Sequence, residues 1–440
     1  MPLRAIFLIA FLVMSLPICF FRPVYGILLW ICLAFVNPQS FSWAFDAFPW
    51  AAAVAAPTIL GMLVFDRKFD RFNSAQFWLL VLLWMWFTVT TVVSTNTAEF
   101  AHHATDTWDK WKFVSKILVM TACTIPIVSS FQRLRYLLLT IAACFGLYVV
   151  KALPFIIMTG GAFRLYGPER SMIADNNDFG LALNMTLPIY FFLAQTESKP
   201  WVKRMLGILF LITIPAIFFT YSRGAMIGLA AVLLLMLLRS SRRLALIPVL
   251  VLGVVVAVYF APDAWQERMN PNRPDAVDAS ARSRLEAWAF ARALAADYPI
   301  TGGGFATFTQ ELFDRYDVPL REIGPHSVFF QVLAEHGYVG LALYLSLILS
   351  CFVTTRRLRK RARLRGDQDV GRYAQMLEFS LIGFLASGVF LGRAYFDYFF
   401  TIVACVIILG RLGKEREAAA APAESVPPAK SREPGVAWAT

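Results

Sequence analysis

The chain is 440 residues long; 58% of its residues are hydrophobic and 16% are charged, whereas a soluble domain has about 25% charged residues. Apolar runs of the length that a helix needs to cross a bilayer recur along it, which excludes a soluble globular protein and predicts an all-α polytopic integral membrane protein. The formal net charge of +12 comes largely from short loops between these runs, so it indicates membrane topology rather than nucleic-acid binding.

The first two apolar runs, 3–20 and 24–35, are divided by Phe21-Arg22-Pro23, so they predict either two tilted helices or one uneven hairpin. No small-residue cleavage site follows the first run, which argues against a signal peptide. Depending on whether these two runs form one unit or two helices, the chain has 12 or 13 transmembrane helices. The other runs span residues 48–65, 76–95, 113–130, 134–158, 178–196, 204–221, 224–238, 244–261, 326–354, 374–391 and 394–412.

Short basic loops mark the cytoplasmic side of a membrane protein. With the basic loop 239–243 on that side, the long polar segment 262–325 lies on the opposite, external face, and so do the polar stretches 96–112, 159–178 and 221–224. The expected units are N-terminal transmembrane helices (1–261), a large external loop with short helices (262–325), C-terminal transmembrane helices (326–414) and a disordered cytoplasmic tail (415–440).

The large external loop contains a predicted helix from Arg284 to about Asp297. Ser283-Arg284-Leu285-Glu286 fits a capping box, which would place Arg284 in the first turn beside free backbone amides, a plausible phosphate cradle. The other interpretation is an exposed amphipathic helix with solvated arginines. Its apolar face would lie on the membrane surface or pack over the bundle, and would be formed by Leu285, Trp288, Ala289 and Arg292.

Two features at the end of the loop precede the next apolar run. The triple glycine 302–304 follows a helix rather than a strand, so it predicts a flexible or tight return of the chain and not a nucleotide-binding loop. Gly324-Pro325 then places His326 at or near a helix N-terminus, where the helix dipole favours the neutral imidazole that a general base needs. The alternative is that His326 only caps or anchors the helix.

Arg223 lies in the tight turn Tyr221-Ser222-Arg223-Gly224, which must be at the membrane boundary. An arginine there is costly unless it is paired, solvated or functional. The structural alternative is an interfacial arginine whose charge reaches the headgroups.

No metal site is predicted. The six cysteines all lie in apolar runs without ligand spacing. His102 and His103 are adjacent and would point apart on a helix. His336 lies too far along its helix to join His326 on one ligand. Because Glu335 and Gly337 flank it, His336 is predicted to be a satisfied intramembrane histidine.

Taken together, these residues resemble the bacterial O-antigen ligases, within the superfamily that also includes O-antigen polymerases and protein O-oligosaccharyltransferases. The resemblance covers most of the chain, and Ser327 stands where the family commonly has Asn, a departure that the ligase pattern tolerates. It rests on the many apolar runs, Asn176-Asn177, Ser222-Arg223-Gly224, the pattern Arg284…Trp288…Tyr298-Pro299…Gly302–Gly304, the pair His326-Ser327 and the following Gly337-Tyr338-Val339-Gly340.

The resemblance implies a GT-C-like glycosyltransferase of the bacterial inner membrane. It would transfer a preassembled glycan, with inversion, from undecaprenyl diphosphate to the lipid A–core oligosaccharide on the periplasmic face, in lipopolysaccharide biosynthesis, without metal or other cofactor. By motif match, His326 would be the base, and Arg223 and Arg284 would handle the diphosphate. Further candidates for binding the diphosphate or the glycan are Arg282, Arg170, Asn177 and Tyr221.

Three other functions stay open. An O-antigen polymerase would use a second lipid-linked glycan as acceptor, and a protein O-oligosaccharyltransferase would use Ser or Thr of a protein. A membrane transporter would have inverted repeats and charged residues at the bilayer midplane. No repeat is evident, and the candidate polar groups lie at one face, which disfavours the transporter.

Overall fold

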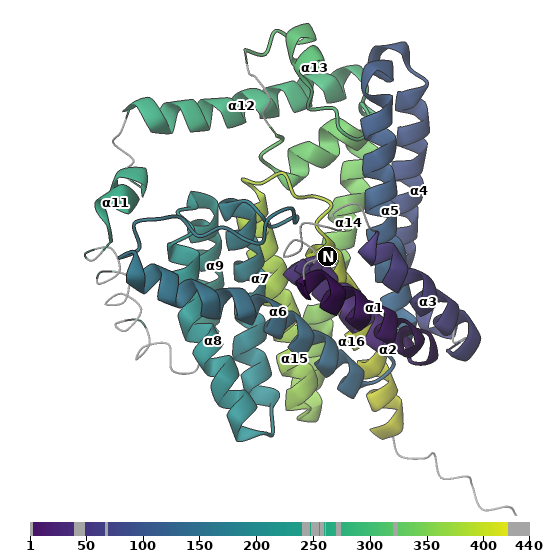
Figure 1. Cartoon of the computed structure of the whole chain (residues 1–440). Coiled ribbons are helices and arrows are strands. Elements are labelled where there is room, and N and C mark those ends of the chain that lie inside the picture. The colour runs from purple at the N-terminus through teal and green to yellow at the C-terminus, as the bar shows by residue number, and fades with distance from the viewer. Residues whose placement is uncertain are drawn as a thin grey trace, which may run out of the picture.

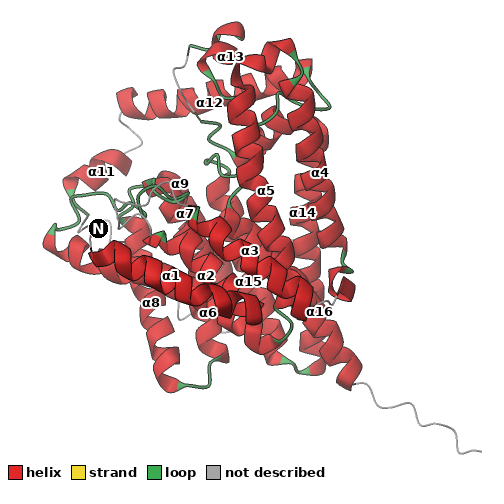
Figure 2. Ribbon diagram, turned by 45° about the vertical axis from the view of Figure 1, so that its right-hand side comes forward, coloured by secondary structure: helices red, strands yellow, loops and turns green. Residues whose placement is uncertain are grey.

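The computed structural model describes residues 3–38, 49–66, 69–239, 261–269, 274–319 and 324–420, together with the isolated positions 247, 255 and 259. Every regular element within these residues is a helix (Figure 2). The elements are α1 (Leu3–Phe21), α2 (Pro23–Val36), α3 (Trp50–Phe65), η2 (Phe69–Phe72), α4 (Ala75–Thr95), η3 (Ala98–His103), α5 (Ala104–Ile127), α6 (Phe131–Met158), α7 (Asn176–Thr196), α8 (Pro200–Phe218), α9 (Arg223–Leu238), α11 (Asp263–Met269), α12 (Pro274–Asp297), α13 (Gln310–Arg315), α14 (Val328–Arg365), α15 (Gln368–Gly388) and α16 (Asp397–Ala420).

Five of the described helices, α4, α6, α7, α8 and α14, are long and apolar enough to cross a membrane. The shorter apolar helices are Ile6–Phe21 within α1, together with α2, α3 and α9. The prediction of an all-helical chain is therefore confirmed for the described residues, and the five apolar helices are consistent with a polytopic membrane protein. Most of the expected run 244–261 lies outside the described residues, so the total of 12 or 13 spans stays a prediction.

Several helices extend beyond the apolar runs that predicted them. Helix α5 begins at Ala104 rather than near 113, and α14 continues past 354 to Arg365. Hydropathy marks only the part of a helix that suits lipid, whereas the helix itself continues as long as its residues favour it. For the same reason α16 continues to Ala420, so the first residues of the expected disordered tail are helical, and 421–440 lie outside the described residues.

Helix α7 is the most enclosed of the long helices, and it packs chiefly on α15, with α8 and α9 beside it (Figure 1). The approach of α15 depends on Gly383, because a Cβ atom there would lie 2.7 Å from the carbonyl oxygen of Asn184. The Asn184 side chain donates hydrogen bonds to the carbonyl oxygen of Ala225 (2.8 Å) and to Ser387 Oγ (3.1 Å), which joins α7 to α9 and α15. Small residues and interhelical hydrogen bonds are the usual means of packing helices in lipid.

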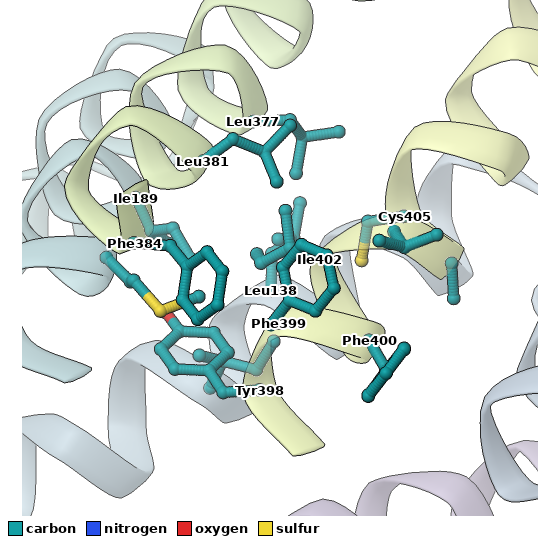
Figure 3. Close-up of a cluster of buried hydrophobic side chains, with 14 of the residues drawn as sticks. Leu138, Ile189, Leu377, Leu381, Phe384, Tyr398, Phe399, Phe400, Ile402 and Cys405 are labelled. Carbon is teal, nitrogen blue, oxygen red and sulfur yellow. The ribbon is translucent and has the colours of Figure 1, made fainter. Parts of the chain in front are cut away.

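The apolar part of this core lies where α15 and α16 meet α6 and α7 (Figure 3). Phe384 of α15 stacks on Phe399 of α16, with the ring centroids 4.5 Å apart and the planes 17° apart. Both side chains are fully buried. Such close packing fixes the relative positions of the helix ends, which carry the polar groups described below.

Helix α12 crosses one end of the bundle, with α13 above it and the tops of α4 and α5 beside it (Figure 1). It packs over the bundle, but through a different face from the expected one: Leu285 is 60% exposed, and Ala289 and Arg292 are also exposed. Trp288 stacks on Phe330 of α14, with the ring centroids 5.0 Å apart. The buried face consists of Ala287, Phe290, Ala291 and Leu294, which pack with Phe100, Leu312, Phe313 and Ala334.

The expected capping box is wrong, because α12 begins at Pro274 and Ser283 lies inside it. Proline suits the first turn of a helix, and the alanine-rich stretch after it continues the helix through Ser283. Glu286 accepts a hydrogen bond from Arg282 Nε (2.8 Å), one turn away, instead of capping. Arg284 therefore lies within a continuous helix and contributes its side chain, without a cradle of free backbone amides.

The triple glycine forms a tight return against a break in α14. The backbone at Gly337 is non-helical (φ 65°, ψ −170°), which divides α14 into two segments. The N–H groups of Gly303 and Gly304 donate to the carbonyl oxygens of Ala334 and Glu335, both at 2.9 Å. Carbonyl groups freed by the break are thus satisfied by the loop, and the first segment of α14, which follows His326, is held against the rest of the bundle.

Candidate functional site

Arg223 is the first residue of α9, and the turn before it is held by several contacts. Ser222 caps the helix by accepting from the backbone N–H of Ala225 (3.1 Å). Tyr221 has a positive φ of 58°, is 2% exposed, and donates its hydroxyl hydrogen to the carbonyl oxygen of Gly161 (2.7 Å). Tyr221, a candidate substrate-binding residue, therefore contributes by fixing the turn that presents Arg223.

The Arg223 side chain reaches across to α11, the short helix that precedes α12. Its Nη2 and Nε atoms lie 2.9 and 3.3 Å from the carbonyl oxygen of Arg268. Arg268 was not among the sequence candidates. Its Nε is buried and, among the described residues, has no hydrogen-bond partner.

Arg284, which belongs to α12, lies near Arg223 and Arg268. Burial and the nearby Arg223 guanidinium lower the pKa of Arg284. Burial, followed by Arg164, Arg223 and Arg284, lowers the pKa of Arg268. The Arg284 guanidinium carbon also lies 5.9 Å from the ring centroid of Phe390, which belongs to the loop between α15 and α16. The structure thus brings the two expected arginines together and adds Arg268, which lies near both of them and near Arg164.

The charge of this arginine cluster, defined as Arg223, Arg268 and Arg284, is not balanced by carboxylates. Within the part of the chain that the structure describes, none of the three forms an ion pair with Asp or Glu. Guanidinium groups that repel one another in a half-buried setting are a ready site for an anion. The cluster is therefore suited to a phosphate-bearing ligand.

His326 lies beside the cluster, just before the N-cap residue of α14, as expected. It has a positive φ of 44°, a conformation that costs a non-glycine residue on the order of 1–2 kcal/mol. Gly392 of the α15–α16 loop packs against it so closely that a Cβ there would lie 2.4 Å from Pro325 Cγ and 3.4 Å from the His326 nitrogen. A strained residue held in place from two elements is typical of a functional position.

The protonation of His326 depends on its neighbours. Burial lowers the pKa of His326, and the Arg284 charge lowers it further, while Asp175 acts in the opposite direction. Burial and the Arg284 charge thus act in the same direction as the helix dipole expected from the sequence. The imidazole is therefore neutral at pH 7 and able to accept a proton.

The other candidates lie around this centre or away from it. Arg282 is 76% exposed and paired with Glu286, so of the two neighbouring arginines it is Arg284 that faces Arg223. Asn177 is the second residue of α7, and its side-chain nitrogen lies 2.8 Å from Oδ1 of Asp175, the N-cap residue.

Arg170 is exposed in the loop before α7, with a positive φ of 57°. It is not among the charges that shift the pKa of Arg268, Arg284 or His326.

Contacts between loops hold this end of the bundle together. Asn176 at the start of α7 donates to the carbonyl oxygen of Thr220 (2.7 Å), just before the Arg223 turn. Asp178 of α7 forms an ion pair with Arg393 of the α15–α16 loop. These contacts tie the beginnings of α7 and α9 to the loop that supports His326.

The remaining histidines lie apart from His326. His336 is fully buried, and a hydrogen bond joins its Nδ1 to Thr90 Oγ1 (2.7 Å). Its Nε2 has no hydrogen-bond partner among the described residues, so the expected satisfied histidine is only half satisfied. The expectation that His102 and His103 point apart is wrong: they lie at the end of the 3-10 helix η3, where His103 Nδ1 is 3.0 Å from His102 Nε2. No group of three or more metal-binding side chains occurs among the described residues.

The fold and this site define a class: a polytopic helical membrane protein with an arginine cluster and a neutral histidine at one end of its bundle. Residues 208–345 match the family model described as O-antigen ligase, and residues 3–197 match a family of unknown function, DUF5935. None of the curated proteins matches the chain. Residues 208–345 are therefore similar to the O-antigen ligase family, and this segment contains the arginine cluster and His326.

Proposed function

We propose that this protein is an O-antigen ligase of the bacterial inner membrane. It transfers a preassembled glycan from undecaprenyl diphosphate to the lipid A–core oligosaccharide, with inversion, on the periplasmic face. The observation that carries the proposal is the position of His326 beside the arginine cluster, within the segment that matches the O-antigen ligase family. A GT-C-like arrangement with 12 or 13 spans belongs to the same proposal.

The arginine cluster supplies the electrostatic part of the reaction. When the bond between the glycan and the diphosphate breaks, negative charge develops on the departing phosphate oxygen. Arg223, Arg268 and Arg284 are positioned before the substrate arrives, so stabilising this charge requires little reorganisation. Diphosphate binding also relieves the repulsion that lowers the pKa of Arg268 and Arg284.

His326 supplies the base. Inverting transfer needs a group that removes the proton of the acceptor hydroxyl as its oxygen attacks the anomeric carbon from the side opposite the diphosphate. A neutral imidazole accepts that proton, and burial together with Arg284 favours the neutral form. Arg284 therefore acts in both parts of the proposal, on the leaving group and on the base.

The proposal is tested by supplying the purified protein with an undecaprenyl-diphosphate glycan and one of three acceptors: lipid A–core, a Ser- and Thr-rich pilin-like protein, or a second lipid-linked glycan. Transfer to lipid A–core alone supports the ligase. Transfer to the protein or to the second glycan identifies an O-oligosaccharyltransferase or a polymerase, which share the donor chemistry. Modification of none of them, with movement of the lipid-linked glycan across a vesicle membrane, identifies a transporter.

A further inference from the structure

A second charged site lies at the opposite end of the bundle from His326. It is a cavity of about 800 Å³ where the end of α9 meets α14 and α15. The part of α14 that lines it begins near Arg356, so about 30 Å of helix separates the cavity from the break at Gly337. Its cationic lining consists of Arg239, Arg356, Arg359, Lys360, Arg363 and Arg372.

A buried carboxylate fixes three of these arginines. Glu378 of α15 is fully buried, and its Oε1 atom lies 3.0 Å from Arg239 Nη2 and 3.5 Å from Arg356 Nε. Its Oε2 atom lies 2.8 Å from Arg359 Nη1. One carboxylate therefore holds three guanidinium groups from two helices, which positions them at the cavity but leaves most of their charge unbalanced.

The rest of the lining adds positive charge. The lining carboxylate, Asp367, already caps α15 by accepting from the N–H of Val370 (3.1 Å) and pairs with Arg416 (3.2 Å). Within the described residues, neither Lys360 nor Arg363 forms an ion pair with a carboxylate. The cavity therefore keeps a large positive excess at the end of a membrane bundle, the setting in which proteins bind phosphate-bearing headgroups.

The surroundings of the cavity indicate a ligand that comes from the bilayer. Leu238, directly before Arg239, is 53% exposed, and Leu349 on α14 is 64% exposed. The ring of Phe352 lies 5.9 Å below the Arg356 guanidinium. A phosphate ion alone would fill little of 800 Å³, whereas a glycerophosphate headgroup with acyl chains would contact both the cations and this apolar surface.

We propose that this cavity binds the phosphate group of an anionic phospholipid, with the acyl chains along α9 and α14. Soluble inorganic phosphate has the same charged group, and the experiment below distinguishes it from a phospholipid. Exposed arginines at the end of a helix can also serve only to orient a membrane protein. Arg357 and Arg361 are exposed residues of α14 outside the cavity lining, so they serve as controls.

The experiment uses the full chain, delipidated in detergent, with lipid binding counted by native mass spectrometry. The probes are dioleoyl-phosphatidylglycerol and dioleoyl-glycerol, which share acyl chains and differ in the phosphate, and inorganic phosphate as a competitor. The test variant is Lys360→Gln/Arg363→Gln, which leaves the Glu378 ion pairs intact. The control is Arg357→Gln/Arg361→Gln, which removes the same charge from the same helix.

We expect one tightly bound phosphatidylglycerol, much weaker binding of dioleoyl-glycerol, and little competition by inorganic phosphate at equal concentration. Each lost charge in the cavity should weaken phosphatidylglycerol binding about fivefold, so the test variant should bind about 25-fold more weakly. Binding by the control should weaken by less than about fivefold. Equal weakening in both variants would overturn the proposal, because diffuse surface charge would explain it. Competition by inorganic phosphate at equal concentration would overturn the assignment to a lipid.

Discussion

Replacing Arg284 by Gln tests the proposed site most directly, because Arg284 is expected to act on both the leaving group and the base. Loss of one preorganised electrostatic stabiliser costs about 2.7–4 kcal/mol of barrier, or roughly 100- to 1,000-fold in rate. The side chain is only half-buried and forms no ion pair in the described chain, so the fold should survive. The assay is glycan transfer from undecaprenyl diphosphate by purified protein, with the melting temperature in detergent measured alongside.

The same substitution predicts a change in pH dependence, with a definite sign. In the wild type, burial and Arg284 place the His326 pKa below its ordinary value, so activity should be lost only as the pH falls through that lowered pKa. Arg284→Gln removes the repulsion but not the burial. The pKa should rise, and the acid limb of the rate profile should move to higher pH. A merely structural role for Arg284 would not move that limb.

Two arginines on the same helix provide controls for Arg284→Gln. Arg292→Gln removes an equal charge from an exposed position and should leave transfer unchanged. Arg282→Gln should also have little effect, because Arg282 is 76% exposed and paired with Glu286. The reasoning would be refuted if Arg284→Gln retained near-native transfer, or if Arg282→Gln caused the larger loss.

Three further substitutions address the base, the arginine cluster and the loop that supports them. His326→Asn should lower the rate of transfer by roughly 100- to 10,000-fold. The melting temperature should change little, since Asn tolerates positive φ. Normal transfer by a folded His326→Asn variant would show that His326 is not the base. Arg268→Gln should raise the donor concentration needed for half-maximal rate, because it weakens diphosphate binding, and equal donor dependence in steady-state kinetics would argue against that role. Gly304→Ala should lower the free energy of unfolding by about 2 kcal/mol or more, and with it the melting temperature. The reason is that φ is 80° at this position and the new Cβ would lie 2.0 Å from Ser94 Oγ. An unchanged melting temperature would contradict this prediction.

The sequence predicted the helical membrane architecture well, because hydropathy depends on composition over a length that the bilayer sets. It also placed His326 near a helix beginning and Arg223 in the tight turn between two helices, since Gly324-Pro325 and the short turn at Tyr221 are local signals. What it missed depends on three-dimensional packing. The capping box was wrong because a stronger start, Pro274, lies upstream, and a local motif does not show which of two possible helix starts is used.

Arg268 shows the limit of the same approach for the site. Nothing in its immediate sequence distinguishes it from the other arginines of the polar loop. Its position follows from Trp265 on the same short helix, whose ring stacks on Phe218 at 4.1 Å and whose Nε1 donates to the Phe218 carbonyl oxygen (3.1 Å). That anchor brings the Arg268 carbonyl oxygen within reach of Arg223. A buried aromatic residue within a polar loop was the one signal that the loop folds back onto the bundle.

The strained residues give a further reason to place the chemistry at this end of the molecule. Positive φ at non-glycine residues occurs in the described chain at Tyr221, His326 and Arg170, among few others. Each conformation has a cost that packing elsewhere must offset. The offset is visible for two of them: the Tyr221 hydroxyl is bonded to Gly161, and Gly392 packs against Pro325 and the His326 backbone. Because a helix could begin without such strain, the positive φ at Tyr221 and His326 supports the proposal that Arg223 and His326 act on the same ligand.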